Sequence, residues 1–323
     1  MLRTRLCDLL GIELPIIQAA IAPYTSGELA AAVSNAGGLG SIGTALRPVE
    51  DLRRQVARTR ELTDRPFVVN FTLLTLDEEA FAAALALRPP LVSLALGDPG
   101  DLVRRAHDAG ARVIHQVHAV PQARRAAERG VDVIIAQGSE AGGFGDTVGA
   151  LALIPQVVDA VAPIPVVAAG GIADGRGLAA ALVLGAQGVN IGTRFLASEE
   201  APIADAWKQA IVAAQSEDAV KVEVMNDIFP PPARAGTYAV APRALRTPFI
   251  DEWQPKRDEA RREAARLRGE VMAALQQGRM HEVVPFTGQT AGLIRDVLPA
   301  AEIVRRLAAE AEAALDRAHR LRS

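Results

Sequence analysis

Residues 165–194 read PVVAAGGIADGRGLAAALVLGAQGVNIGTR and contain a complete strand–helix–strand unit. The apolar runs at 165–169 and 188–191 have the length and composition of buried strands. Between them, residues 176–184 have helical spacing, and Gly185 follows, as is typical of the left-handed end of a helix. Two such strands joined by a helix predict a parallel β-α-β unit.

The same unit recurs towards the N-terminus, where helical segments such as 26–34, 101–109 and 121–129 separate further apolar runs. Runs that are almost continuously hydrophobic are typical of strands buried on both faces. Eight strands alternating with helices predict a closed (β/α)8 TIM barrel of the α/β class, with a doubly wound open sheet as the alternative. The expected strands are 15–18, 39–42, 66–70, 91–95, 112–117, 132–137, 165–169 and 188–191.

The alternation stops after residue 191. An amphipathic pattern at 298–319 predicts a last helix that closes the barrel. We therefore expect a barrel at 1–197 and 291–323, with a helical insertion or lid domain at 198–290 after the eighth strand. Within the insertion, the sequence predicts a helix at 198–216, an apolar stretch at 220–225 and a charged helix at 256–277 whose mixed signs indicate a solvated face.

The composition narrows the range of functions. The chain has 323 residues, half of them hydrophobic, and a net charge of −3, which gives no electrostatic footprint for nucleic acid or an acidic membrane surface. Cys7 is the only cysteine, so neither a disulfide framework nor a thiolate metal cluster is expected. The N-terminal stretch is too short and too charged for a signal peptide. We expect a cytoplasmic enzyme without a metal site.

Two glycine-rich strand ends predict a phosphate site. Gly170 and Gly171 follow the seventh strand, whereas Gly192 and Thr193 follow the eighth. Many barrels bind phosphate with these two loops, and glycine lets the backbone approach the anion. The G-x-G-x-x-G match at 38–43 is interpreted as structural, because it coincides with the second strand instead of following one.

The loop after the sixth strand carries the candidate polar groups. Residues 136–145 read AQGSEAGGFG, with Gln137, Ser139 and Glu140 at the end of the strand, where barrel enzymes keep their catalytic groups. Four glycines in ten residues indicate a loop that wraps closely around a flat ligand.

Together these motifs resemble the nitronate monooxygenase family, formerly called 2-nitropropane dioxygenases, and the related FMN-dependent enoyl-ACP reductases. The resemblance covers nearly the whole chain and lies in the segments 15–19, 69–71, 136–143, 168–173, 188–194 and 285–292. It implies a barrel with a small helical domain over its mouth and a tightly bound, non-covalent FMN. The cofactor-binding residues that it implies are Gln18, Ala19, Ala20, Ile21, Asn70, Gln116, Gln137, Gly142, Gly143, Ala169, Gly170, Gly171, Gly192 and Thr193.

One position departs from the family pattern. The family has a histidine after Glu-Ala-Gly-Gly, as catalytic base or polar anchor of the substrate, but this chain has Phe144. Phenylalanine can neither accept a proton nor donate a hydrogen bond. Strand alternation in 112–117 places Gln116 and His118 on one face, so His118 is a candidate replacement base, with Gln137 and Glu140 as the next candidates. His115, on the other face, is expected to be a packing residue.

The resemblance implies an FMN-dependent oxidoreductase that oxidises a small, nitronate-like substrate with oxygen. One alternative is an NAD(P)H-dependent reductase of quinones, enones or enoyl thioesters. A flavin-binding protein without catalysis and a non-redox barrel enzyme acting on a phosphorylated metabolite also stay open. The small-molecule substrate, the donor and acceptor (NAD(P)H or oxygen) and the oligomeric state are left undecided.

Overall fold

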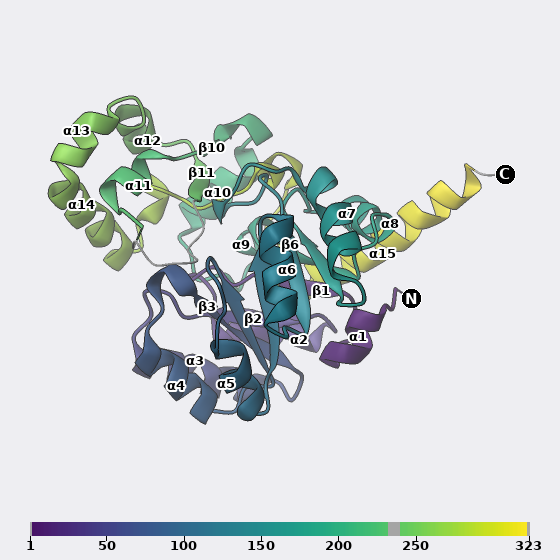
Figure 1. The fold of residues 1–323 in the computed structure, drawn as a ribbon. Helices are drawn as coiled ribbons and strands as arrows, with labels where there is room; N and C mark the ends of the chain where they lie inside the picture. The colour runs from purple at the N-terminus through teal and green to yellow at the C-terminus, as the bar shows by residue number, and fades with distance from the viewer. Residues whose placement is uncertain (1, 232–239, 322–323) are drawn as a thin grey trace.

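In a computed structural model, which describes residues 2–231 and 240–321, eight parallel strands form a closed barrel (Figure 1). They run in the order β1-β9-β8-β6-β5-β4-β3-β2. The two end strands meet because the amide of Gln18 donates to the carbonyl of Leu39 at 2.9 Å. The barrel prediction is therefore confirmed, and the open-sheet alternative is wrong. The strands are β1 (Ile16–Gln18), β2 (Gly40–Gly43), β3 (Phe67–Thr72), β4 (Leu91–Ala95), β5 (Arg112–Val117), β6 (Val133–Gln137), β8 (Val166–Ala169) and β9 (Gly188–Ile191).

Helices cover the outside of the barrel, and the short helix α1 (Arg5–Leu10) closes the end of the barrel at which its strands begin. Leu6 and Leu10 belong to the hydrophobic cluster that includes the inward-facing Val68, Ile114 and Val167. The outer helices are α2 (Gly27–Asn35), α3 (Val49–Leu62), α4 (Glu78–Ala86), α5 (Leu102–Asp108), α6 (Val120–Glu128), α7 (Ala150–Val161), α8 (Gly175–Val183) and α15 (Ala300–Arg320).

The expected last helix is α15, which packs against α8. It buries Ile303, Val304, Leu307 and Ala311 at helical spacing, as the amphipathic pattern predicts. Its C-terminal turns extend beyond the body of the molecule (Figure 1). The prediction of a helix that completes the barrel wall is confirmed.

The glycines at 38–43 allow close packing. A Cβ atom at Gly40 would lie 2.0 Å from the carbonyl oxygen of Ala30 on α2, and one at Gly43 would lie 2.7 Å from the Cβ of Ala22. Both distances are far below van der Waals contact, so strand β2 needs glycine there. The structural interpretation of this motif is confirmed.

Helices and two strands fill the chain between β9 and α15, and they differ from the expected elements. The predicted helix at 198–216 is shortened because Pro202 disfavours helical geometry in the residue before it. The predicted helix at 256–277 is two helices, interrupted at Glu263. The elements are α9 (Thr193–Leu196), α10 (Asp205–Ala213), β10 (Ala219–Lys221), α11 (Val224–Ile228), β11 (Ala241–Leu245), α12 (Pro248–Trp253), α13 (Arg257–Arg262) and α14 (Ala264–Gln276).

A small antiparallel sheet, which the sequence analysis missed, ties this region to the barrel. Its order is β10-β11-β7, and β7 (Gly143–Gly145) lies in the glycine-rich loop after β6. The region also has its own hydrophobic cluster, around Trp207, Ile250 and Leu267. The exact domain boundaries at 197 and 291 stay a prediction.

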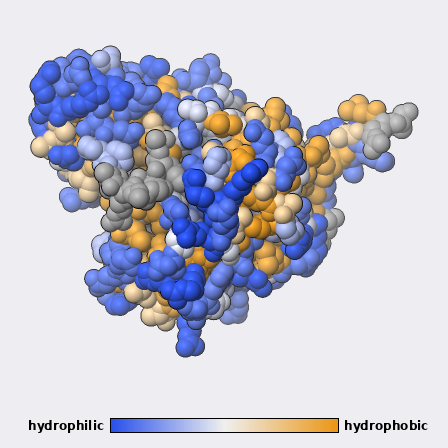
Figure 2. All heavy atoms as spheres, in the orientation of Figure 1, coloured by the Kyte–Doolittle hydropathy of each residue, from blue (hydrophilic) through white to orange (hydrophobic). Residues whose placement is uncertain are grey.

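The outer face over α12, α13 and α14 is hydrophilic (Figure 2). On α13, Arg257 and Arg261 both pair with Asp227 of α11. These ion pairs agree with the interpretation of the charged run as a solvated helix face. Within residues 2–231 and 240–321, no helix has the length and apolar character needed to cross a membrane.

Candidate active site

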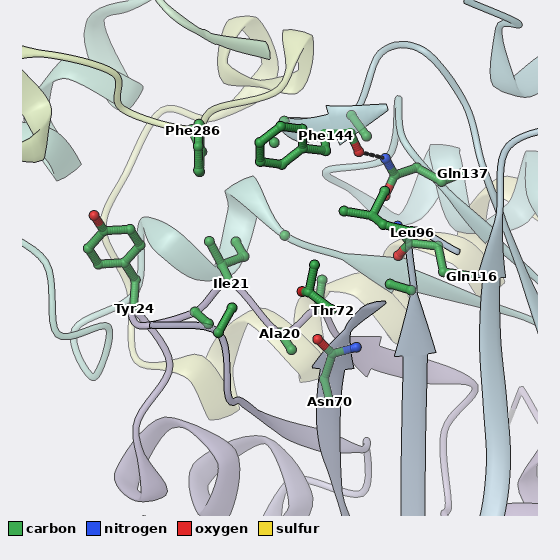
Figure 3. Close-up of a pocket in the computed structure, with 18 of the residues that line it drawn as sticks. Ala20, Ile21, Tyr24, Asn70, Thr72, Leu96, Gln116, Gln137, Phe144 and Phe286 are labelled. Carbon is green, nitrogen blue, oxygen red and sulfur yellow. Dashed lines mark hydrogen bonds between the residues drawn. The ribbon is translucent and has the colours of Figure 1, made fainter. Parts of the chain in front are cut away.

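A cavity of about 560 Å³ lies at the carboxyl ends of the barrel strands, beneath the region between β9 and α15 (Figure 3). Barrel enzymes place their active sites at this end. The floor consists of small polar side chains at the ends of neighbouring strands. They are Gln18, Asn70, Ser93, Gln116, Gln137 and Asn190.

Some of these polar groups are held by the protein itself. Asn70 donates from Nδ2 to Oγ of Ser93 at 3.0 Å, and Gln137 donates from Nε2 to the carbonyl of Phe144 at 2.8 Å. Gln18 accepts a hydrogen bond from the amide of Ser41 at 2.8 Å and donates to the carbonyl of Ala19. The floor is therefore a fixed set of neutral donors and acceptors.

One end of the cavity is built from backbone. Gly170 and Gly171 have φ values of +86° and +74°, in the region that favours glycine. A Cβ atom at Gly170 would also lie 2.8 Å from the carbonyl of Gly138. Across from them, Thr193 accepts a hydrogen bond from the amide of Gly288 at 2.9 Å, which fixes the loop after β9.

Every cofactor-binding residue that the resemblance implies lines this one cavity. The loop after β1 contributes a wall in which Ala19 and Ile21 face Gly192, with 3.3 Å between Cδ1 of Ile21 and a Cβ atom built at Gly192. The remaining members come from β1, β3, β5, β6 and β8 and from the loops after β1, β6, β8 and β9, so segments far apart in the sequence converge here. The lining set is Gln18, Ala19, Ala20, Ile21, Asn70, Gln116, Gln137, Gly142, Gly143, Ala169, Gly170, Gly171, Gly192 and Thr193.

Phe144 lies in β7 and faces the cavity, as Figure 3 shows. Its ring meets Phe286 edge to face, with centroids 5.8 Å apart. Phe144 therefore gives the cavity an apolar wall at the position where the family has a histidine.

The structure does not bring His118 into the cavity. β5 ends at Val117, so the alternation that aims Gln116 at the floor does not extend to His118. The His118 side chain is buried, and burial lowers its pKa to about 4. The negative charge of Asp146 and a backbone hydrogen bond with Phe144 raise this pKa, but they do not outweigh the burial. Its imidazole is therefore neutral at physiological pH, and this placement gives no support to a direct role as general base. His115 is fully buried, as expected of a packing residue.

Glu140 also lies outside the cavity lining. Both of its carboxylate oxygens accept from the amide of Ala150, at 3.0 Å each. Ala150 is the first residue of α7, whose free amides attract a negative charge. Glu140 thus stabilises the start of a helix, and its position outside the lining gives no support to a catalytic role.

The sequence did not predict the wall of the cavity that lies opposite the floor. Arg268, Val271, Met272 and Leu275 of α14 line it at the spacing i, i+3, i+4, i+7. This stripe was visible in the sequence, but a helix face of this kind usually packs into a core. Other lining residues from this region are Met225, Phe229, Met280 and Phe286.

Ionisable side chains are scarce around the cavity. Among the described residues, those that line it include no Asp, Glu, His, Lys or Cys, and Tyr24 and Arg268 are the two with an ionisable side chain. In the same part of the chain, no group of three or more His, Cys, Asp or Glu side chains is arranged to hold a metal ion.

The nitronate monooxygenase family model matches residues 3–86 and 80–310. The chain is 35% identical over 301 residues to (3aS,4S,5R,7aS)-5-hydroxy-7a-methyl-1-oxo-octahydro-1H-indene-4-carboxyl-CoA dehydrogenase of Mycobacterium tuberculosis, covering 92% of this chain and 78% of that protein. The chain belongs to the nitronate monooxygenase family.

Two solved structures share the whole architecture. FabK from Thermotoga maritima has a TM-score of 0.90 and 35% identity, covering 99% of each chain. Nitroalkane oxidase from Streptomyces ansochromogenes has a TM-score of 0.83 and 29% identity, covering 97% of this chain and 99% of that one. The family consists of flavin-dependent oxidoreductases, and this chain is one of them.

Proposed function

We propose that this chain binds FMN and reduces an apolar substrate whose carbon–carbon double bond is conjugated to a carbonyl, such as an enoyl thioester, with a hydride that originates from NAD(P)H and a proton taken up from solvent. The observation that carries this proposal is the cavity itself. Its described lining has Phe144 at the position of the family histidine and contains no Asp, Glu, His, Lys or Cys. A neutral substrate that reacts by hydride transfer suits such a lining better than one that needs a protein base.

The residues at the glycine end fit a phosphate. Gly170 and Gly171 hold left-handed backbone, and a Cβ atom at Gly171 would have no other atom closer than 3.7 Å, so the backbone there leaves room for a group. The amide floor suits the polar edge of a flavin ring, because amides offer both donors and acceptors. A bound FMN supplies the two-electron redox chemistry, and the protein supplies binding and orientation.

The apolar walls would exclude water from the substrate. Leu96, Phe144 and Phe286 lie around the same part of the cavity in Figure 3. The M. tuberculosis relative is named as the dehydrogenase of a carboxyl-CoA compound, which supports a thioester substrate here.

Oxidation of an alkyl nitronate by oxygen is the second candidate. The family match favours it, and Arg268 is a cationic lining residue to which an anionic nitronate could bind. Because a nitronate has already lost its proton, its oxidation does not require a protein base.

The two candidates can be separated in one set of assays. We expect the purified protein to contain FMN, to be reduced by NAD(P)H under anaerobic conditions, and to be reoxidised by 2-octenoyl-CoA. Turnover of NAD(P)H with 2-octenoyl-CoA should be faster than turnover of an alkyl nitronate with oxygen. Phe144→His should raise nitronate turnover about tenfold, because an imidazole can donate a hydrogen bond to the anionic nitronate, and a hydrogen bond to a charged group contributes roughly 1.5–3 kcal/mol. Phe144→Leu is the matched control, since it opens the same wall without a titrating group.

Two results would overturn the proposal. Failure to bind FMN would remove the cofactor assignment. Wild-type turnover of nitronates at the rate of Phe144→His, together with no reduction of the enoyl thioester, would favour the second candidate.

A further inference from the structure

Tyr24 is a buried tyrosine in the cavity wall to which the proposed function assigns no role. It follows β1, is 9% exposed, and lines the cavity. Its ring meets Trp207 edge to face, with centroids 5.0 Å apart. In Figure 3, Tyr24 lies on the opposite side of the cavity from Gln116 and Gln137, and its hydroxyl points away from the strand ends.

The hydroxyl of Tyr24 makes no hydrogen bond within residues 2–231 and 240–321. The hydroxyl oxygen is not among the buried side-chain atoms that lack a partner, so it is accessible and free to donate to water or to a ligand. The hydrophobic cluster that includes Tyr24 is formed by side chains such as Trp207, Met225 and Val271, which offer no strong acceptor. Burial raises the pKa of Tyr24, so the phenol keeps its proton and remains a donor.

A molecule that enters the cavity and displaces water from this hydroxyl can supply its acceptor. The flavin is the weaker candidate, because the polar floor that suits its ring edge lies on the other side, at Asn70, Gln116 and Gln137. A charged acceptor is also disfavoured, since apolar neighbours raise the free energy of a buried charge. A neutral oxygen on the substrate satisfies both conditions.

We propose that the Tyr24 hydroxyl donates a hydrogen bond to a carbonyl or amide oxygen of the bound substrate, away from the reacting carbon atoms, and so selects for acyl substrates that carry such an oxygen. This inference rests on the proposed function. Because the bond is remote from the strand ends, it contributes equally before and during the reaction. Tyr24 is then a specificity residue that acts on KM and leaves kcat unchanged.

Tyr24→Phe tests this, because it removes the hydroxyl and keeps the ring against Trp207. We expect the Kd of octanoyl-CoA, measured by perturbation of the flavin spectrum, to rise roughly 3- to 10-fold, the effect of one neutral hydrogen bond. The KM for 2-octenoyl-CoA should rise by the same factor, with kcat and FMN content as in the wild type. The ketone 2-cyclohexenone has no carrier arm, and its only carbonyl is conjugated to the reacting double bond. Its KM should be the same for both proteins, and an equal rise in its KM would contradict a bond away from the reacting carbon atoms.

The readouts separate this inference from the proposed function. Equal octanoyl-CoA binding by wild type and Tyr24→Phe would overturn the role of Tyr24 alone. Loss of FMN from the variant would overturn it as well, since the hydroxyl would then serve the cofactor. Binding of octanoyl-CoA without turnover of 2-octenoyl-CoA by the wild type would contradict the proposed function alone.

Discussion

At the scale of single residues, Gly171 offers a direct test of the phosphate site. A Cβ atom built there has Glu140 as its nearest neighbour, at 3.7 Å, so a side chain has room, whereas φ is +74°. Gly171→Asp would put a negative charge beside the bound phosphate, and we expect FMN affinity to fall at least about tenfold. Flavin content and FMN fluorescence quenching measure this.

Gly171→Asn is the matched control for that substitution. It has the same size, is neutral, and tolerates left-handed backbone as well as Asp does. We expect it to retain much more FMN than Gly171→Asp. Equal loss in both variants would attribute the effect to the backbone, and full FMN content in a folded Gly171→Asp would refute the phosphate site.

Where a motif fixes the backbone, as at Gly170, Gly171 and Gly192, the residues predicted to bind the cofactor do line the cavity. His118 does not line it, because side-chain alternation applies within a strand and β5 ends one residue earlier. Glu140 does not line it either, because the direction of a side chain in a glycine-rich loop depends on a distant partner, here the amide of Ala150. Tyr24 was missed for the same reason: its surroundings come from helices far along the chain.

At the scale of elements, β5 and the turn after it bury two histidines and so make stability depend on pH. Burial lowers the pKa of both His115 and His118 to about 4, below the usual 6.5. The unfolded chain therefore binds more protons than the folded one between about pH 6.5 and 4. The stability that the two neutral imidazoles contribute is fully present above this window and is lost as the pH falls through it.

His118→Gln should remove about half of this dependence. As the pH falls from 6.5 to 4.5, the free energy of unfolding should decrease more steeply for the wild type than for the variant. The difference between the two slopes should be at most about 1.4 kcal/mol for each pH unit. Urea unfolding across this range measures the difference. His319→Gln, on the exposed end of α15, is the control, and a pH-independent difference for His118→Gln would contradict the assignment.

The elements that sequence analysis predicted well are those with a local signal. β-Branched runs mark all eight barrel strands to within two residues at each end. The small sheet of β7, β10 and β11 was missed because two of its strands have three residues, too few for periodicity to be recognised, and their pairing is non-local. Since β7 carries Phe144, that sheet also sets the position of the apolar wall.

At the scale of the whole molecule, the cavity joins the barrel to the region between β9 and α15. Repetition of one strand–helix unit predicts the barrel, because each unit needs its neighbours to bury its strand. No local pattern predicts how α14 meets the barrel mouth, since its apolar stripe looks like that of any packed helix. Filling the cavity with a ligand should therefore stabilise both parts together.

Removal of FMN tests this coupling. A ligand present at a thousand times its Kd stabilises the folded protein by about 4 kcal/mol, which corresponds to a rise in Tm of roughly 8 °C for a protein of this size. We expect FMN to raise the Tm of the apoprotein by that order, in a single transition.

Riboflavin, which lacks the phosphate, should give a smaller shift because it makes no contact with the loops at Gly170, Gly171 and Gly192. In Gly171→Asp the two ligands should give similar shifts, because the variant removes what distinguishes them. Equal shifts in the wild type would mean that the glycine loops do not bind the phosphate, and two separate transitions would mean that the cavity does not couple the two parts.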